Sequence, residues 1–582
     1  QLVRKVENFL GISRQSLVTL ALTGMLAAAS CSKTTQTLPF SVIPQPAEVE
    51  ISGGGGYRLK SSDLIVSEQI DDNVKSAIAE FAAHLQTVAG GKNSIISGEE
   101  GKGVVFSIDT TLANEAYTIE TDKSRVQVKA NSYNGFIYAL QTIAQMLPAE
   151  FYGSKRARGV DFSIPCGVIK DAPRFAYRGV LIDVGRHFYS VDEIKKCLDI
   201  MSVYKENVFH WHLTEDQGWR MEIKKYPRLT EIGSLRHGTQ IDFDRTHLRP
   251  EDHGGFYTQD EMRDVVAYAA KRGITVIPEL DLPGHMLSAL AAYPELGCTG
   301  GPYEVANTWG VKKDVLCVGK EETFKFLEDV LTEMMDIFPS KYINIGGDEV
   351  PKDRWNACPR CRARMKALGL YDHDGHTAGQ YLQNYVTARI QKFLAEHGRR
   401  IIGWEEILEG DLAEGATVMT WKGTGENVDQ RLWNYDCVMS PRGYMYIDRY
   451  QSHEQDREPF SIGAYLPVEN VYGYEPYDGV PEYGKNRILG VQANLWTEYV
   501  NTPEYLEYML LPRLAALSEV QWVQEGHKDW NRFRKALDHS AKIYEEMGLT
   551  YCKYAWGIVG LPEHEQPART PDELKEYLDN RQ

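Results

Sequence analysis

Two adjacent carboxylates are the sharpest chemical feature of the sequence. Asp348 and Glu349 end the segment YINIGGDE, residues 342–349, in which a short apolar run is followed by two glycines. Glycine lets a backbone approach a ligand closely. Neighbouring carboxyl groups suit general acid–base chemistry when one is protonated and the other is ionised near neutrality. An isolated Asp-Glu pair after a strand could also cap a helix, so the surrounding sequence has to distinguish a catalytic pair from a helix cap.

Polar and aromatic side chains recur at the ends of short apolar segments that alternate with amphipathic helices. We expect strands at 179–184, 207–212, 274–280, 342–345, 400–403, 417–420, 436–440 and 488–494. This alternation predicts parallel βαβ units, and eight of them predict a (β/α)8 TIM barrel of the α/β class, whose sites form at the carboxyl ends of the strands. The residues at those ends are Asp183, Arg186, His210, His212, Asp281, His285, Asp348, Glu349, Trp404, Glu405, Trp421, Tyr446, Asp448, Trp496 and Glu498.

The length predicts a second domain beside the barrel, because 582 residues exceed one ordinary core. Residues 41–168 combine period-two alternation, at 117–119 and 126–128, with helical stretches at 74–88 and 136–146. We therefore expect a small N-terminal α+β domain at 41–168 and a catalytic TIM barrel at 169–556. A last helix is expected at 531–546, followed by a C-terminal tail at 557–582.

The N-terminus has the features of an export signal. Basic residues within the first 14 precede an apolar run at 17–29, which Ser30 and Cys31 follow. The run is short for a membrane span, which needs about 20 apolar residues. AASC at 28–31 is similar to a bacterial lipoprotein box, so Cys31 is a candidate lipid anchor, and simple cleavage near Ala29 is the alternative. We expect a signal peptide at 1–31, a linker at 32–40, and a protein exported to the periplasm or the bacterial cell surface.

The charge of the chain argues against several classes of partner. The formal net charge is −17, whereas nucleic acids and anionic membranes are bound by clustered Lys and Arg. The sequence holds no dinucleotide-binding fingerprint and no phosphate loop, because the glycine run at 53–56 lacks the Lys-Ser/Thr that would have to follow it. We expect neither a nucleic acid partner nor a cofactor.

Eight cysteines follow Cys31, which is sparse for a disulfide scaffold in a chain of this length. Cys298 and Cys317 flank a glycine-rich loop and could form a loop staple in an oxidising compartment. Cys358 and Cys361 form one C-x-x-C pair, which is weak evidence for zinc because a structural site needs four ligands. A local disulfide or two free thiols is the preferred interpretation, and we expect no metal.

Long segments of the chain, over about residues 43–525, resemble glycoside hydrolase family 20, the β-N-acetylhexosaminidases. The matching segments are YRGVLIDVGRHF, NVFHWHLTEDQGWR, GGFYTQDEMRDVVAYAAKRGITVIPELDLPGH, YINIGGDE, IIGWEEIL and GVQANLWTEY, with IPQP and NGFIYALQTIAQML similar to the family's small N-terminal domain. The resemblance implies an exo-acting hydrolase that removes terminal non-reducing N-acetylhexosamines, GlcNAc or GalNAc, from glycans or glycoconjugates with retention. In that family the substrate's own acetamido group is the nucleophile, and an oxazolinium intermediate forms.

The resemblance also implies roles for individual residues. Glu349 is implied as the general acid and then the base, and Asp348 as the residue that orients and polarises the 2-acetamido group. Tyr446 is implied to hydrogen-bond the acetamido oxygen, and Asp216 with His285 to form a pair that tunes Glu349. Trp404, Trp421 and Trp496 are implied to pack the acetamido methyl group, and Arg178, Asp448 and Glu498 to bind sugar hydroxyls.

Alternatives to these roles stay open. A retaining glycosidase whose carboxylate attacks the sugar directly would not need the tryptophans and Tyr446, and a glycan-binding lipoprotein with a decayed barrel would not need an intact catalytic pair. Arg178 could instead form a structural salt bridge under the barrel. Glu215 and Gly185 depart from the family, which often has Asp and Ser there. A metal cluster could also be imagined from His and Asp residues, although they come from different strands. These residues are His210, His212, Asp281 and His285.

Overall fold

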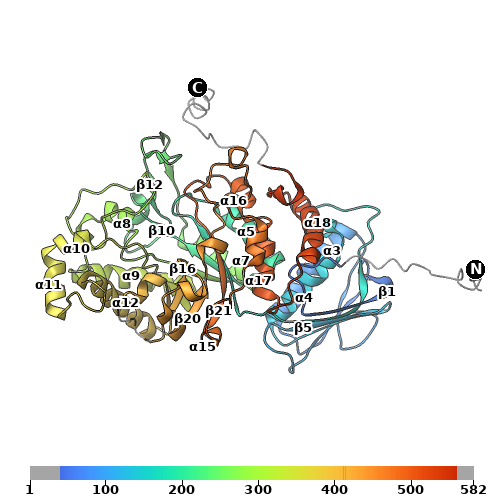
Figure 1. Cartoon of the computed structure of the whole chain (residues 1–582). Helices are drawn as coiled ribbons and strands as arrows, with labels where there is room; N and C mark the ends of the chain where they lie inside the picture. Colours follow the sequence, from blue (N-terminus) through green and yellow to red (C-terminus); the bar gives the residue numbers. More distant parts are fainter. Residues whose placement is uncertain (1–39, 411, 413, 560–582) are drawn as a thin grey trace, which may run out of the picture.

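The computed structural model describes residues 40–410, 412 and 414–559, which form two domains (Figure 1). The expected boundary at 168–169 is wrong, because the last strand of the first domain continues to Asp171 and the barrel begins at Tyr177. The expected signal peptide, Cys31 and all but the last residue of the linker lie outside the described residues, as does most of the expected tail. The described helices include none that is both long and apolar enough to cross a bilayer.

The first domain is a seven-stranded mixed sheet in the order β1-β7-β5-β6-β4-β2-β3. Helix α4 (Tyr133–Met146) joins it to the barrel, because Gln141 donates a hydrogen bond to Ser202 at 2.9 Å. Asp71 caps the N-terminus of helix α3 (Asp72–Ala89), because its side chain accepts hydrogen bonds from two backbone N–H groups of the first turn. The strands are β1 (Glu48–Arg58), β2 (Leu64–Val66), β3 (Ile95–Ser97), β4 (Gly103–Ile108), β5 (Tyr117–Thr121), β6 (Arg125–Ala130) and β7 (Ser163–Asp171).

The second domain is a closed barrel of eight parallel strands, in which the last strand pairs with the first. The TIM-barrel prediction is therefore confirmed, and all eight expected strands are present. Closure depends on Gly490, because a Cβ atom there would lie 1.7 Å from the carbonyl oxygen of Tyr177 on the paired strand. The strands are β8 (Tyr177–Asp183), β9 (Val208–His212), β16 (Thr275–Glu279), β17 (Tyr342–Asn344), β18 (Arg400–Trp404), β19 (Thr417–Thr420), β20 (Asp436–Met439) and β21 (Ile488–Leu495).

Long helices cover the first half of the barrel, and shorter turns follow β18 and β19. Three of the helices start with capping boxes, in which a Ser or Thr and the Glu or Gln three residues later bond each other's backbone. The main helices are α5 (Val191–Val203), α7 (Gln259–Ala270), α9 (Glu321–Ile337), α12 (Ala378–Glu396), α16 (Pro503–Leu510), α17 (Arg513–Trp522) and α18 (Trp530–Met547). Apolar side chains fill the barrel interior, including Leu181, Ile277, Ile402, Met419 and Val438, so the site has to lie at a rim.

Candidate active site

A pocket of about 270 Å³ opens at the carboxyl ends of the barrel strands. It is small and concave and has aromatic and charged walls, which suits one polar ring rather than an extended chain. Most of the residues predicted from the sequence line it. The lining residues are Arg186, Asp348, Glu349, Trp404, Trp421, Arg442, Tyr446, Asp448, Arg449, Ile462, Gly463, Ala464, Trp496 and Glu498.

A glycine turn after β17 places the two adjacent carboxylates in this pocket. Gly346 and Gly347 have φ angles of 61° and 94°, and a Cβ atom on Gly346 would lie 1.9 Å from the Asp281 carboxylate. Glu349 itself has φ of 50°, a conformation that costs a non-glycine residue about 1–3 kcal/mol. The turn therefore lets Asp348 and Glu349 both face the pocket, as a regular strand would not.

Three tryptophans and Tyr446 form an aromatic box around Asp348. The Trp404 and Trp496 rings lie 5.8 Å apart, and Tyr446 lies 6.2 Å from both Trp496 and Trp421. Hydrogen bonds fix two of the indoles, because Trp404 donates to Glu279 at 2.9 Å and Trp421 donates to Glu406 at 3.2 Å. The box is thus rigid, with a size and polarity that fit a small apolar group such as an acetamido methyl.

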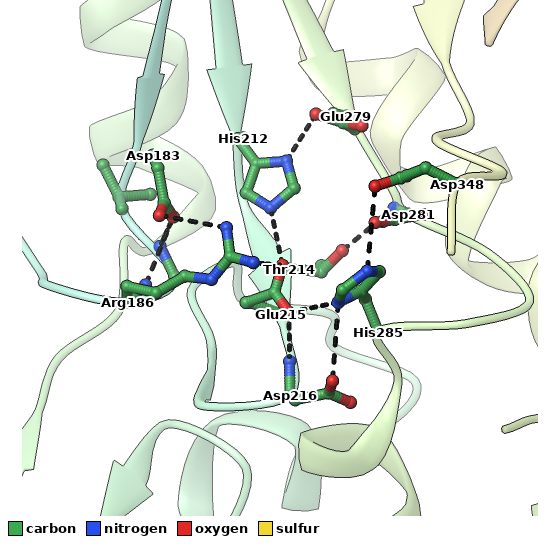
Figure 2. A network of polar contacts seen from close by, with 12 residues as sticks. Asp183, Arg186, His212, Thr214, Glu215, Asp216, Glu279, Asp281, His285 and Asp348 are labelled. Atoms are coloured by element: carbon green, nitrogen blue, oxygen red, sulfur yellow. Dashed lines mark hydrogen bonds and ion pairs between the residues drawn. The ribbon is translucent and has the colours of Figure 1, made fainter. Parts of the chain in front are cut away.

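His285 connects Asp348 to a buried network of acids (Figure 2). Its Nδ1 atom lies 2.6 Å from Glu215 and 3.4 Å from Asp216, and its Nε2 atom lies 3.7 Å from Asp348 and 3.6 Å from Glu349. The predicted Asp216–His285 pair is present, but Glu215 is the nearer acid. Although burial opposes a charged ring, Glu215 and Asp216 raise the pKa of His285 well above its usual range, so an imidazolium faces the catalytic carboxylates.

His212 occupies a similar position between two acids, which bears on the imagined metal cluster. Its ring nitrogens contact Glu279 and, at 3.1 Å, Glu215. Burial disfavours the charged ring, yet the two carboxylates raise the pKa of His212 well above its usual value. The ring would have to lose a proton before it could bind a metal, and its centroid lies 5.0 Å from that of Trp496.

Arg186 lines the pocket together with Arg442 and Arg449, and the sequence-based prediction placed it at a strand end without assigning it a role. It follows β8 and is fixed by Asp183 and Glu215, each 3.2 Å from its guanidinium. The same guanidinium lies 5.2 Å from the centre of the Trp496 ring. The signal was present in the sequence, because Arg186 stands at the carboxyl end of its strand.

The prediction that Arg178 binds the sugar is wrong. Arg178 is the second residue of β8, at the opposite end of the barrel, and it is 1% exposed. Its guanidinium binds Glu115 of the first domain at 3.1 and 3.2 Å and the hydroxyl of Tyr138 at 2.8 Å. A residue at the amino end of a barrel strand points away from the site, so Arg178 has the structural role that was the alternative.

Substituting each of the two arginines separately tests this correction. We expect Arg178→Met to lower the free energy of unfolding by about 3–5 kcal/mol, because Glu115 loses a buried partner, while KM and kcat stay near the wild-type values. Arg186→Lys should instead lower kcat/KM by about 10–100-fold, since charged hydrogen bonds are worth roughly 1.5–3 kcal/mol. Urea unfolding and steady-state kinetics of both variants measure this, and a raised KM in Arg178→Met would contradict it.

Two buried carboxylate oxygens in the pocket lack partners. Among the described residues, Asp348 Oδ1 and Asp448 Oδ1 accept no hydrogen bond, although both atoms are inaccessible to water. Burial raises the pKa of both carboxyls to about 7. Buried polar atoms without partners are rare and costly, so a ligand donor that reaches either oxygen after a small side-chain movement would be favoured.

The pKa shifts of Asp348 and Glu349 run opposite to their predicted roles. Burial raises the pKa of Asp348 to about 7, whereas His285, whose Nε2 atom is 3.6 Å away, lowers the pKa of Glu349. The Glu349 side chain is 42% exposed, against 16% for Asp348. These pKa shifts favour a proton on Asp348, so a bound substrate has to reverse that preference before Glu349 can act as an acid.

Residues of the loop after β20 complete the pocket, and the sequence reasoning assigned no site role to them. Ile462, Gly463 and Ala464 close one side of it. Phe243 from the loop at 236–255 packs on Phe460 with ring centroids 5.0 Å apart. Nothing in the residue types of either loop marks which positions face the pocket.

Comparison with known proteins matches this geometry to one family. The model described as "Glycosyl hydrolase family 20, catalytic domain" matches residues 175–525, and the family's domain 2 matches residues 40–172. The chain belongs to glycosyl hydrolase family 20. The family prediction made from the sequence segments is thus confirmed, and the domain 2 match covers the seven-stranded sheet and its helices.

Members of the family resemble the chain over most of its length. A β-hexosaminidase of Porphyromonas gingivalis is 41% identical over 91% of this chain, which spans 66% of that relative's length. The solved exo-β-N-acetylglucosaminidase of Vibrio harveyi, in complex with N-acetylglucosamine, has a TM-score of 0.76 at 32% identity, covering 89% of this chain and 79% of that one. The β-N-acetylhexosaminidase of Streptomyces coelicolor A3(2) also has a TM-score of 0.76, at 28% identity, with 91% and 99% covered.

Proposed function

We propose that the chain is an exo-β-N-acetylhexosaminidase that releases terminal N-acetylhexosamines with retention of configuration. The observation that carries the proposal is the aromatic box beside an unpartnered Asp348 oxygen. An acetamido group has an apolar methyl for the box and an N–H for that oxygen. A plain hexose has a 2-hydroxyl that can donate to this oxygen but no methyl group for the box, so the aromatic box selects the acetamido group.

The first step forms a ring within the substrate. The acetamido carbonyl oxygen attacks the anomeric carbon, and the bond from that carbon to the leaving oxygen breaks. Glu349 gives its proton to the leaving oxygen. Asp348 accepts a hydrogen bond from the acetamido N–H and stabilises the positive charge that develops on the oxazolinium. Trp404, Trp421 and Trp496 hold the acetamido group in attacking geometry, which replaces an enzyme nucleophile by positioning.

The second step returns the site to its starting state. Glu349, now ionised, takes a proton from a water molecule, and the hydroxide oxygen attacks the anomeric carbon. The bond to the acetamido oxygen breaks, so the product regains its acetamide and Glu349 regains its proton. Two inversions at one carbon give overall retention.

Substrate binding moves the proton from Asp348 to Glu349, as the two roles require. The sugar covers the exposed Glu349 carboxyl, which disfavours its charged form and raises its pKa. The acetamido N–H bonds the unpartnered Asp348 oxygen, which favours the charged form there and lowers its pKa. One proton shared by the pair therefore moves to Glu349 when the sugar is bound.

The active state of the free enzyme accordingly carries one proton on the pair. Above pH 7 the proton is lost, because the higher pKa, that of Asp348, is about 7. At low pH Glu349 is protonated as well, and Asp348 can no longer stabilise positive charge. We expect a bell-shaped profile of kcat/KM against pH with its upper limb near 7.

The variant Asp348→Asn tests whether the titration of Asp348 causes the upper limb of the pH profile. With Asp348 neutral, only Glu349 titrates, and its lowered pKa should move the upper limb to lower pH. The control Asp353→Asn, at an exposed position on α10 (Asp353–Ala357) of the same loop, should leave the limb in place. An upper limb that stays near 7 in Asp348→Asn would assign it to another group.

Activity on paired aryl glycosides tests the function directly. We expect turnover of p-nitrophenyl N-acetyl-β-D-glucosaminide and none of the plain β-D-glucoside. Turnover of both substrates would favour a glycosidase with its own carboxylate nucleophile, and turnover of neither would favour a glycan-binding protein. The epimeric N-acetylgalactosaminide, measured in parallel, gives the preference at the 4-hydroxyl, for which Arg186, Asp448 and Glu498 are the proposed partners.

Export and lipid attachment at Cys31 form a separate part of the proposal. The support is the apolar run at 17–29 and the AASC sequence that ends it. The expected result is that the exported wild-type protein partitions into detergent, whereas Cys31→Ala stays in the aqueous phase. If both proteins stay aqueous, simple secretion is the better account.

A further inference from the structure

Four cysteines from distant parts of the barrel domain meet at one point outside the pocket. The Sγ atom of Cys317 lies 3.8 Å from that of Cys358 and 3.7 Å from that of Cys361, and the Sγ atoms of Cys298 and Cys361 lie 3.9 Å apart. All four sulfurs lie within 4.8 Å of one another. Three of the residues are buried, Cys298 is partly buried, and all four are free thiols. The sequence interpretation, which treated them as two separate pairs, missed this convergence.

The spacing of the sulfurs fits a common centre rather than two pairs. A disulfide joins sulfurs at about 2.05 Å. Four sulfurs around tetrahedral zinc, each about 2.3 Å from the metal, lie about 3.8 Å from one another, and the three measured distances of 3.7–3.9 Å match that edge. Cys317 is also almost equally far from Cys358 and Cys361, so neither is its preferred partner. We propose that Cys298, Cys317, Cys358 and Cys361 bind one structural zinc ion.

The backbone around the cluster is built for close approach of its segments. Cys358 precedes helix α11 (Pro359–Leu368), and Cys361 lies in its first turn. Gly319 packs on that turn, because a Cβ atom there would lie 2.5 Å from the backbone nitrogen of Cys361. A larger residue at 319 would push the segment that carries Cys317 away from Cys361.

The position of the cluster gives the zinc a bracing role. Cys317 donates its backbone N–H to Leu296 at 2.8 Å, and Leu316 donates to Pro283, two residues before His285, at 3.0 Å. The indole of Trp355, on α10 of the loop that follows Glu349, donates to Leu316 at 2.9 Å. The site thus ties the loop after β16 to the loop after β17, the two loops that carry His285 and the catalytic pair. Four protein ligands leave no open position on the metal, which is typical of structural rather than catalytic zinc.

Zinc content and thiol state of the wild-type protein test the proposal without any substitution. The full chain, purified without chelators from zinc-supplemented medium, should contain one equivalent of zinc by mass spectrometry of the metal. A mercurial reagent should release that zinc, detected with pyridylazoresorcinol. Thiols counted under denaturing conditions should be equally numerous with and without prior reduction. Four additional thiols after reduction, with no zinc bound, would show two disulfides and overturn the proposal, as would an equivalent of iron in place of zinc.

A matched pair of cysteine variants then links the metal to these residues. We expect Cys361→Ser to lose most of its zinc and to unfold at a Tm several degrees lower. Cys437→Ser, which removes a buried free thiol of β20 outside the cluster, should keep a full equivalent of zinc. If Cys361→Ser does not fold, chelator extraction of the wild-type enzyme should produce the same loss of Tm, reversed by added zinc. Full zinc content in Cys361→Ser, or a Tm that does not respond to chelation, would contradict the proposal.

Discussion

Glu349→Gln should lower kcat on natural glycosides, whose leaving groups are poor, by about 10²–10⁴-fold, because it removes the proton that the leaving oxygen needs. The loss should be much smaller on p-nitrophenyl or dinitrophenyl N-acetylglucosaminides, whose leaving groups depart without protonation. Glutamine keeps the size of the side chain and can still face His285, whose Nε2 atom lies 3.6 Å from the carboxylate in the wild type. The variant should therefore fold normally.

Two controls make this result specific to proton donation. Asp353→Asn, at an exposed position four residues along the same loop, should leave all rates near wild type. Rescue by azide should appear only in Glu349→Gln, because azide can attack the anomeric carbon of the oxazolinium without a general base. Equal losses on activated and natural substrates would show that Glu349 positions the sugar instead of protonating the leaving group.

The fold followed from the sequence because its strands are short apolar runs at regular intervals. β8, β9 and β16 to β21 all fall where the alternation with helices predicted them. The domain boundary was misplaced for a local reason. β7 ends in Lys170 and Asp171, polar residues that the expected boundary assigned to the barrel domain, yet both pair with β5, at Thr118 and Tyr117.

The catalytic pair and the aromatic box were accessible from the sequence because each member lies at the carboxyl end of a barrel strand or in the loop that follows it. The error at Arg178 shows the limit of that reasoning. The segment YRGVLIDVGRHF has one arginine near each end of β8, and only the carboxyl end of the strand faces the site. Strand direction in a barrel selects Arg186 over Arg178 without any coordinates. Glu215 was noted only as a departure, because its contacts with Arg186, His212 and His285 depend on a turn of the backbone.

The cysteine cluster lay beyond the sequence for a different reason. Cys317 and Cys358 are separated by a whole helix and the strand β17, and only the return of the chain from the barrel brings them together. Spacing along the chain recognises zinc sites made from two close pairs. Here only Cys358 and Cys361 are close in sequence, so the other two ligands could be assigned only from the fold.

Asp348→Asn should reduce kcat on N-acetylglucosaminides by about 10²–10³-fold, including on activated aryl glycosides, which Glu349→Gln should largely spare. The reason is that asparagine keeps the size of the side chain but removes the negative charge that stabilises the oxazolinium, a loss of a few kcal/mol. The charge effect should be large here, because the Asp348 side chain is only 16% exposed and burial in the aromatic box limits screening by water.

Inhibition and trapping experiments decide whether this charge acts on the substrate's acetamide. A cyclic thiazoline analogue resembles the oxazolinium more than the ground state, so it should inhibit the wild-type enzyme strongly and Asp348→Asn much less, since the protonated ring loses its counter-charge. If a carboxylate of the enzyme attacked the sugar directly, a 2-fluoro sugar would instead leave a covalent glycosyl-enzyme. Mass spectrometry of the intact protein separates the two routes. A stable sugar adduct on Asp348, together with indifference to the thiazoline, would refute substrate assistance, while strong thiazoline inhibition that depends on Asp348 would assign the nucleophile to the acetamide.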